Sequence, residues 1–325
     1  MELAHKRVLV TGGAGFVGSH LVDQLLGLGC QVTSYDNLDP FYGEKSRNYG
    51  HNLKNPSFRF VEGDIRDYER LSATMKKTEL VFHEAAQAGV RYCIAEPMKA
   101  HEVNVTGTMN VLLAAKQNKV KKIVYASSSS IFGVPQKVPI TENHPTNPTS
   151  IYGATKLAAE KYCHAMSQTD GIAVTSLRYF SVYGPRGRPD QVTHAFAEKV
   201  LAGEQPVIYG NGAQSRDFTY VSDIVSAAIF AGEAEEANGE VFNIGYGREI
   251  TIMEVVNKVI SRLGGEMKPK FLPLYAGDFP RTLAANEKAT RVLRWRPAVG
   301  FDEGLGRFLD WFKERYSERR EAPPS

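Results

Sequence analysis

The chain has 325 residues, of which 42% are hydrophobic and 23% are charged. This balance excludes intrinsic disorder, collagen and coiled coil for most of the chain, and the length allows one large domain or two lobes. Thirty-nine Lys and Arg against 36 Asp and Glu leave a net charge of +3 without a long basic block, so nucleic acid is not expected as a partner.

Signals for secretion, membranes, disulfides and metals are not found. The apolar run near the N-terminus, Val8–Val10, is too short for a signal peptide or a membrane span. We therefore expect no membrane association and a cytoplasmic protein. Cys30, Cys93 and Cys163 are widely spaced and the eight His are scattered, so neither a disulfide framework nor a metal site is expected.

Short β-rich runs alternate with helical patterns through the first half of the chain. The alternation predicts a parallel sheet with helices on both faces. It therefore favours an α/β fold of the Rossmann type, a doubly wound parallel sheet, with a smaller and discontinuous α/β substrate-binding domain. The expected strands are Arg7–Thr11, Gln31–Asp36, Phe58–Val61, Leu80–His83, Ile123–Ala126 and Ala173–Phe180.

The boundary between the two lobes is expected at Gly184–Pro189, where loop chemistry breaks the alternation. The runs Phe218–Val221 and Val241–Ile244 again predict strands, so we expect the chain to return to the first lobe. This assigns residues 1–182, with return segments at about 217–250, to a first domain, and 183–216 with 251–316 to a second domain. The polar residues 317–325 are expected to form a mobile tail.

A glycine-rich segment, Thr11–Gly18, follows the first expected strand and leads into a helical pattern. Its glycines allow a tight turn, close approach of backbone N–H groups to a pyrophosphate, and packing of the helix on its strand. Asp36 ends the second strand, 18 residues beyond Gly18, where an acid binds the ribose hydroxyls of NAD and repels the 2′-phosphate of NADP. A purely structural turn is the alternative, but the order of strand, loop, helix and strand favours NAD. The contacts expected here are Gly12, Gly15, Phe16, Val17, Gly18, Asp36 and Asn37.

Tyr152 and Lys156 are four residues apart on an expected helix and so share one face. Upstream, Ser127–Ser130 follow a strand at its carboxyl end, where such folds bind ligands. A tyrosine that acts as a base at neutral pH needs its pKa lowered by about three pH units, which Lys156 and the positive nicotinamide of NAD can supply. A surface tyrosine beside a solvated amine is the alternative. The glycine loop and the serines favour catalysis.

Several motifs in chain order resemble the extended short-chain dehydrogenase/reductases, and within them the nucleotide-sugar 4-epimerases. They are Thr11–Gly18, Gly63–Asp67, Asn104–Thr108, Tyr152 with Lys156, Arg178–Pro185 and Arg216–Tyr220, and the similarity runs from Val8 to about Phe312. The resemblance implies an NAD-dependent enzyme that acts on a UDP-sugar. It makes the first domain, residues 1–182 with about 217–250, the expected NAD-binding domain, and the second, 183–216 with 251–316, the expected nucleotide-sugar-binding domain. It also implies a homodimer that pairs the helices Val103–Gln117 and Tyr152–Met166.

The same resemblance assigns roles to individual residues. It implies that Tyr152 and Lys156 are catalytic, with Ser128 as the hydroxyl partner at the sugar's 4′-oxygen and Ser129 as a second donor. Further expected NAD contacts are Asp64, Ile65, Ala85, Ala86, Gln87, Asn104 and Tyr179. Arg216 is implied at the substrate diphosphate and Asp278 at its ribose, although each on its own is also typical of a surface charge.

Two segments, His83–Tyr92 and Gly184–Asp190, resemble the UDP-glucuronate 4-epimerases more than the UDP-glucose enzymes. Ser181 replaces the Asn that is common in the latter, and Arg188 is suited to pair with a uronate carboxylate. The alternative for Arg188, as for Arg186, is a loop cation. Glu84 departs from the Leu that commonly follows His83.

These features predict conversion of UDP-glucuronate to UDP-galacturonate through a 4-keto intermediate. Ser127–Gly133 contains no carboxylate of the kind that related decarboxylases and dehydratases carry, which favours epimerisation. The alternatives are a UDP-glucose or UDP-N-acetylglucosamine 4-epimerase, a dehydrogenase of an external substrate, which would accumulate NADH, and a non-catalytic NAD-binding regulator. The presence of both Tyr152 and Lys156 argues against the regulator.

Overall fold

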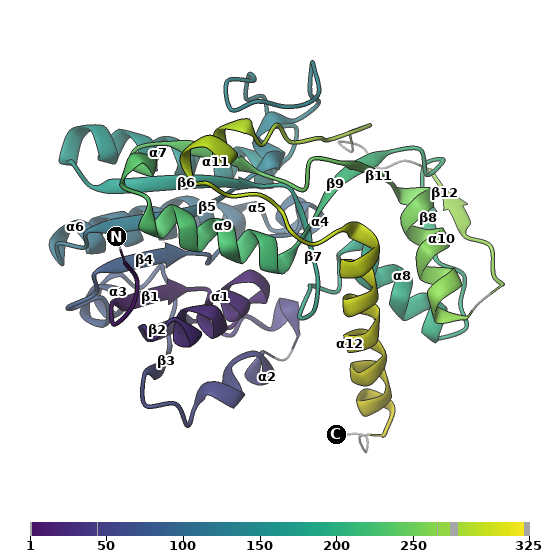
Figure 1. Cartoon of the computed structure of the whole chain (residues 1–325), viewed down its shortest axis with the longest axis horizontal. Helices are drawn as coiled ribbons and strands as arrows, with labels where there is room; N and C mark the ends of the chain where they lie inside the picture. The colour runs from purple at the N-terminus through teal and green to yellow at the C-terminus, as the bar shows by residue number, and fades with distance from the viewer. Residues whose placement is uncertain (1, 44, 265, 274–278, 322–325) are drawn as a thin grey trace.

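The main body of the protein is a seven-stranded parallel sheet. A computed structural model describes residues 2–43, 45–264, 266–273 and 279–321 (Figure 1). The strand order is β10-β6-β5-β4-β1-β2-β3, and each neighbouring pair is parallel. The strands are β1 (Arg7–Thr11), β2 (Gln31–Asp36), β3 (Phe58–Glu62), β4 (Leu80–His83), β5 (Lys122–Ser128), β6 (Ala173–Tyr179) and β10 (Val241–Ile244). The expected doubly wound Rossmann-type fold is confirmed.

Helices cover both faces of this sheet because its strands are apolar on both sides. Val8 and Val10 of β1 share a core with α1 (Phe16–Gly27) and α9 (Val221–Glu233), whereas Leu9 packs in the core formed with α6 (Gly107–Gln117) and α7 (Ile151–Asp170). A period of two along a strand directs successive side chains to opposite faces. The helical segment expected at Val103–Gln117 begins as a π-helical turn, Glu102–Thr106, and continues as α6.

The smaller lobe is built around two short sheets (Figure 1). One sheet contains β7 (Ser181–Tyr183), β9 (Ser215–Tyr220) and β11 (Glu249–Thr251), and the other pairs β8 (Val207–Tyr209) with β12 (Lys270–Leu272). The helices α8 (Val192–Leu201), α10 (Ile252–Leu263) and α12 (Phe301–Glu321) pack together beside them. The strand expected at Phe218–Val221 thus forms as β9, but it pairs with β7 and β11 and not with the main sheet. The chain returns to the main sheet through α9 and β10.

The C-terminal end corrects one expectation. Residues 317–321 do not form a tail, because α12 continues to Glu321 and residues 322–325 lie outside the described residues. Ion pairs hold the last turns: Glu318 Oε2 lies 2.5 Å from Arg47 Nη1 and 3.5 Å from Arg315 Nη1. The former contact joins α12 to α2 (Ser46–Tyr49), which the local composition of the tail does not reveal.

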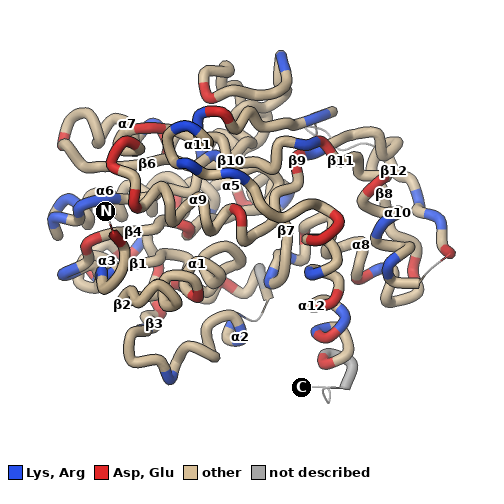
Figure 2. The backbone as a smooth tube through the Cα atoms, viewed as in Figure 1, with Lys and Arg blue, Asp and Glu red and all other residues tan. Residues whose placement is uncertain are grey.

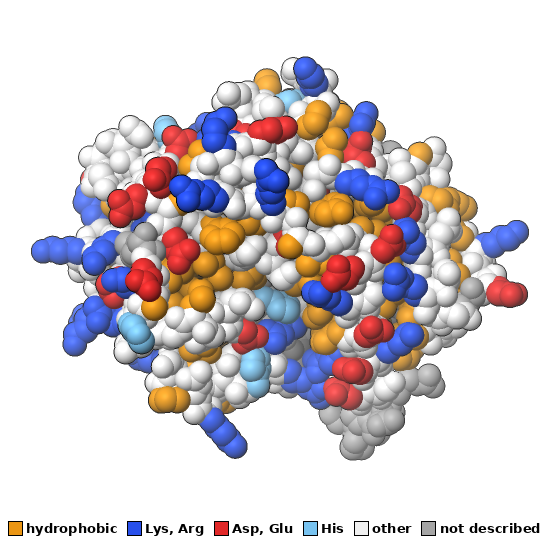
Figure 3. Space-filling view, viewed as in Figure 1, with side chains coloured by type: hydrophobic (Ala, Val, Ile, Leu, Met, Phe, Trp, Pro, Cys, Tyr) orange, Lys and Arg blue, Asp and Glu red, His pale blue; other side chains and the backbone are white. Residues whose placement is uncertain are grey.

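The remaining helices are short. They are α3 (Tyr68–Thr74), α4 (Val90–Ala95), α5 (Pro97–His101) and α11 (Glu287–Val292), with 3₁₀ turns at Pro40–Tyr42, Gly50–Asn52, Ser129–Phe132 and Glu235–Ala237. Charges of both signs are interspersed along the chain and over the face shown in space-filling view (Figures 2 and 3). In the part of the chain that the structure describes, none of the helices has the length and apolar character needed to span a bilayer.

Candidate active site

A cavity of about 590 Å³ lies at the carboxyl ends of the central strands and extends to the smaller lobe. Of the site residues that the sequence predicts, all line it except two. Asn104 does not line it, and Asp278 falls outside the described residues. The structure therefore brings together, around one cavity, side chains that are far apart in the sequence. Among the described residues, no group of three or more His, Cys, Asp and Glu is placed to hold a metal ion.

The glycine loop forms the floor of one end of this cavity. Gly12 has φ +72°, and a Cβ there would lie 2.6 Å from the backbone nitrogen of Ala85. A Cβ on Gly18 would lie 2.2 Å from the carbonyl oxygen of Gly12. The helix α1 begins at Phe16, so its unpaired N–H groups face the same space. A backbone cradle that excludes side chains at the start of a helix fits the pyrophosphate of NAD.

Asp36 stands beside this loop in a defined position. Its Oδ2 accepts a hydrogen bond from the Ala14 N–H at 3.1 Å, and its Oδ1 accepts one from the Leu38 N–H at 2.9 Å. Lys45 Nζ lies 3.0 Å from Oδ1, and both side chains are buried. Lys45, which also lines the cavity, was not predicted, because it is a single lysine in a loop nine residues further along the chain.

A second acidic residue, Asp64, lines the cavity close to Asp36. Asn37 donates to its Oδ2 at 2.9 Å, and Arg66 forms an ion pair with the same oxygen at 2.8 Å. Burial raises the pKa of Asp64, but the hydrogen bonds from Arg66 and Asn37 outweigh it and hold the pKa at about 2. Asp64 is therefore ionised at neutral pH and can accept hydrogen bonds from a ligand.

Asn104 does not line the cavity, but it forms hydrogen bonds with Gln87, which does. It is buried, its Oδ1 accepts a hydrogen bond from the Gln87 N–H at 2.7 Å, and its Nδ2 donates to the Gln87 carbonyl and to Thr155 Oγ1, both at 3.0 Å. These contacts join the loop after β4 to α7, the helix that carries Tyr152 and Lys156. Asn104 thus holds Gln87 and does not itself face the cavity.

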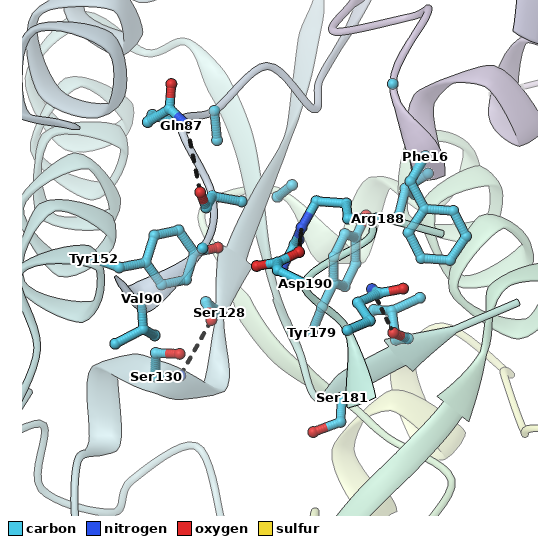
Figure 4. A pocket seen from close by; sticks show the side chains of 18 of the residues that line it. Phe16, Gln87, Val90, Ser128, Ser130, Tyr152, Tyr179, Ser181, Arg188 and Asp190 are labelled. Carbon is cyan, nitrogen blue, oxygen red and sulfur yellow. Dashed lines mark hydrogen bonds and ion pairs between the residues drawn. The ribbon is translucent and has the colours of Figure 1, made fainter. Parts of the chain in front are cut away.

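Tyr152 lies in the first turn of α7, where Ser150 Oγ caps the helix by accepting a hydrogen bond from the Gly153 N–H at 3.1 Å. Its hydroxyl lies near the side chain of Ser128 at the end of β5, and this proximity favours ionisation of the hydroxyl. Figure 4 shows the Tyr152 ring pointing into the cavity, toward Arg188 and Asp190. The predicted tyrosine and serine therefore lie close together at the cavity.

Burial is the largest cause of the pKa shifts of Tyr152 and Lys156. Burial raises the pKa of Tyr152, while the positive charge of Arg188 and the hydrogen bond with Ser128 lower it. Burial lowers the pKa of Lys156 to about 8, against the opposing charge of Glu84. The ammonium of Lys156 also lies 4.5 Å from the centre of the Tyr125 ring. Lys156 is thus mostly protonated at neutral pH.

Glu160 of α7 forms an ion pair that was not predicted from the sequence. Glu160 binds Arg178 of β6, with Oε1 2.7 Å from Nη2, and Ser127 Oγ of β5 donates to Glu160 Oε2 at 2.6 Å. All three side chains are buried. Glu160 lies four residues after Lys156 and eight after Tyr152, so helical spacing places it on the same face of α7. This pair fixes α7 against the ends of β5 and β6.

The opposite end of the cavity is lined by residues of the smaller lobe. Arg216 lies over the Phe279 ring, 4.5 Å from its centre, and donates to the carbonyl of Ser215 at 2.7 Å. Arg188 forms a two-point pair with Asp190, in which Nε lies 2.9 Å from Oδ1 and Nη2 3.3 Å from Oδ2 (Figure 4). Ser181 lines the same end.

Arg186, two residues before Arg188, binds elsewhere. Its Nη1 lies 2.8 Å from Oδ2 of Asp23 on α1. Sequence alone allowed both arginines to be loop cations and gave Arg188 a second interpretation at a carboxylate, and the structure separates the two by their partners. Phe279 is a contact that sequence reasoning missed, because it belongs to no recognised motif. Asp190 belongs to the segment Gly184–Asp190, but its pairing with Arg188 was not predicted.

The family model for the NAD dependent epimerase/dehydratase family matches residues 8–245. The chain belongs to this family. It is an NAD-dependent enzyme. The predicted family, enzyme class and cofactor are confirmed.

Three solved structures of similar proteins carry different sugar nucleotides in their names. The UDP-glucuronic acid 4-epimerase from Bacillus cereus, in complex with UDP-glucuronic acid and NAD, is 32% identical with a TM-score of 0.91, and the match covers 95% of this chain and 100% of that one. The UDP-glucose 4-epimerase from Thermotoga maritima, with UDP-glucose, is 35% identical with a TM-score of 0.89, covering 95% and 99%. The UDP-N-acetylglucosamine 4-epimerase from Methanobrevibacter ruminantium M1, in complex with UDP-N-acetylmuramic acid, is 33% identical with a TM-score of 0.90, covering 96% and 99%.

Proposed function

We propose that this enzyme is a UDP-sugar 4-epimerase and that it interconverts UDP-glucuronate and UDP-galacturonate. The observation that carries the choice of sugar is the position of Arg188. Its guanidinium lines the same cavity as Tyr152 and Ser181, and its charge is close enough to influence ionisation of the Tyr152 hydroxyl. A glucuronate differs from a glucose in its carboxylate, and a planar guanidinium binds a carboxylate through two parallel hydrogen bonds.

In the proposed reaction, Tyr152 removes the proton of the sugar's 4′-hydroxyl and later returns it. Ser128, which lies near the Tyr152 hydroxyl, bonds the same sugar oxygen and holds it in line for proton transfer. When bound, NAD accepts the hydride from carbon 4 and gives it back to the opposite face of the 4-keto ring, and its positive ring favours the phenolate. Arg216 binds the diphosphate while the ring turns over.

Arg188 has an internal partner that the substrate must displace or share. In the ligand-free protein Asp190 occupies two of its donors, at 2.9 and 3.3 Å. A uronate carboxylate presents the same two oxygens as Asp190 does. Binding of UDP-glucuronate therefore exchanges one carboxylate for another at Arg188, whereas a neutral 6-hydroxymethyl group cannot replace the ionic contact.

The test is to incubate the purified enzyme separately with UDP-glucuronate, UDP-glucose and UDP-N-acetylglucosamine and to separate the products. We expect turnover of UDP-glucuronate, and Arg188→Ala should lower its kcat/KM by about 10- to 100-fold, as expected for loss of a charge-assisted contact of about 1.5–3 kcal/mol. Arg186→Ala, whose parent residue is bound to Asp23, is the matched control. Turnover of UDP-glucose without turnover of UDP-glucuronate would contradict the proposal, because it would show that the substrate carries an uncharged sugar. Accumulation of NADH in proportion to substrate would show a dehydrogenase.

We also propose a homodimer, in which α6 and α7 pair with their copies in a second chain. Both helices present large apolar side chains to solvent: Leu113 of α6 is 42% exposed and Tyr162 of α7 is 42% exposed. Leu113→Glu is expected to convert a dimer into a monomer, measured by light scattering across a range of concentrations. The exposed Leu53, which lies away from these helices and is 59% exposed, gives the control Leu53→Glu. A monomeric parent protein would contradict the proposal.

A further inference from the structure

Glu84 is a carboxylate that reaches the cavity from the end of β4. Tyr179, the last residue of β6, donates its hydroxyl to Glu84 Oε1 at 2.9 Å. Because β4 and β6 lie on either side of β5, the two side chains meet above the end of the strand that carries Ser128. The backbone of Glu84 is fixed as well, since its N–H donates to the carbonyl of Thr11 at 3.1 Å. Glu84 therefore connects the glycine loop to the catalytic side of the cavity.

Lys156 is the cation that faces Glu84, and the charge of each favours the ionised form of the other. Other titratable groups near Lys156 are neutral or already paired. Glu160 is bound by Arg178, and burial raises the pKa of the Cys163 thiol well above its usual range. Burial also raises the pKa values of the Tyr125 and Tyr179 hydroxyls, so both remain protonated at neutral pH.

His83, the residue before Glu84, is neutral too. Its Nδ1 lies 2.7 Å from Thr11 Oγ1 and its Nε2 lies 2.9 Å from Thr108 Oγ1. Thr108 donates its own hydroxyl to the carbonyl of Asn104 at 2.7 Å, so it accepts from His83 Nε2. Burial lowers the pKa of His83 to about 3. Among these groups, Glu84 is left as the anion that balances Lys156.

Hydride transfer at the proposed site brings two positive charges into one cavity, and Glu84 lines that cavity as a negative charge. The reaction needs the Lys156 ammonium and an oxidised, positively charged nicotinamide within reach of the same tyrosine. Two cations in a low-dielectric cavity destabilise each other, so that either the ammonium loses its proton or the oxidised ring binds less tightly. One carboxylate in the same cavity offsets this repulsion.

We propose that Glu84, held by Tyr179, is a positioning residue that acts as the counter-charge for Lys156 and the oxidised nicotinamide. The inference rests on the proposed epimerase function, because a reaction that uses NAD as an internal oxidant brings both cations together in every turnover. It explains why a carboxylate stands after His83, where the resemblance leads us to expect Leu.

The ionisation of Glu84 agrees with this role. Burial raises the pKa of Glu84 to about 7, whereas the hydrogen bond from Tyr179 and the charge of Lys156 lower it. A bound cation lowers it further, so Glu84 is ionised in the loaded enzyme at neutral pH. Loss of this charge lowers the pKa of Lys156 below its value of about 8. The alkaline limb of the pH–rate profile should then move to lower pH.

The deciding variant is Glu84→Gln, which keeps an oxygen acceptor for Tyr179 and removes only the charge. We expect the alkaline limb of kcat to move down by about one pH unit, which is about tenfold in the protonation equilibrium of Lys156. A second measurement needs no sugar. The holoenzyme is equilibrated with mixtures of NAD and NADH, and bound NADH is followed by its fluorescence. The preference for NAD over NADH should fall by about tenfold.

Two further variants separate charge from shape. Glu84→Asp retains the charge and is expected to keep the preference for NAD within about threefold of the parent enzyme. Glu62→Gln removes an exposed carboxylate at the end of β3, outside the cavity, and should change neither measurement. An unchanged alkaline limb and cofactor preference in Glu84→Gln, or an equal loss in the Asp and Gln variants, would overturn the proposal. Lack of turnover by the parent enzyme with every UDP-sugar would instead overturn the proposed function, since the cofactor measurement is made without substrate.

Discussion

Replacement of Tyr152 by phenylalanine is expected to lower kcat by about 10²- to 10⁴-fold while the protein continues to bind NAD. Removal of a positioned general base has effects of this size. The ring lies in the first turn of α7 and its hydroxyl lies near Ser128, so the substitution removes the proton acceptor and leaves the apolar contacts of the ring. Turnover is measured with UDP-glucuronate, and NAD content is measured by releasing the cofactor from the denatured protein.

Tyr162→Phe is the matched control for this experiment. Tyr162 lies on the same helix, is 42% exposed and is remote from the cavity, so its hydroxyl should not affect kcat. If Tyr152→Phe retains the rate of the parent enzyme at every pH, another group abstracts the proton. Loss of NAD together with turnover would show that Tyr152 acts chiefly in cofactor binding.

Several of the predicted site residues that line the cavity are encoded by short local patterns. The glycine spacing requires a cradle without side chains, and the structure shows that a Cβ on Gly12 or Gly18 has no room. Helical spacing puts Tyr152 and Lys156 on one face, and both line the cavity. Asp36 follows from its place at the end of the second strand, 18 residues beyond Gly18. In each case the deciding interactions lie within one or two adjacent elements.

Several contacts that the sequence does not predict join segments that are distant along the chain. Glu84 meets Tyr179 across an intervening strand, whereas Lys45, also not predicted, pairs with Asp36 from a loop nine residues away. No spacing rule connects residues 84 and 179, because their contact depends on the order of strands in the sheet. The partner of Arg186 likewise depends on tertiary structure, because Asp23 lies on α1, whereas Arg188 pairs with Asp190 in its own loop.

The errors about the fold have the same origin. The apolar run at Phe218–Val221 does form a strand, but a strand pattern does not state its partners, and β9 pairs in the smaller sheet. The polar segment after residue 316 lacks an apolar period, yet α12 continues through it to Glu321. Glu318, near the end of α12, forms an ion pair with Arg47 of α2, which lies far away in the sequence. The local composition of a segment does not reveal that tertiary contacts with distant residues extend a helix through it.

The second large effect is expected for Gly18→Ala in the glycine loop. A Cβ at this position would lie 2.2 Å from the carbonyl oxygen of Gly12 and 3.0 Å from the Cα of Gly13, so the loop or the helix must move. Overpacking of this kind destabilises by about 1–3 kcal/mol. Because the displaced atoms belong to the cradle itself, affinity for NAD should fall about 5- to 150-fold. Isothermal titration with NAD measures the affinity, and thermal unfolding measures the stability.

Gly27→Ala, at the other end of the same helix, makes the steric argument testable. Gly27 is exposed and a Cβ there meets nothing within 4 Å, so the added methyl group causes no overlap. Alanine favours a helix over glycine by about 0.5–1 kcal/mol, and the variant should be as stable as the parent or slightly more stable, with unchanged affinity for NAD. The two variants add the same atom to the same helix. If they weaken NAD binding equally, the close approach of Gly18 to Gly12 is not what shapes the cofactor site.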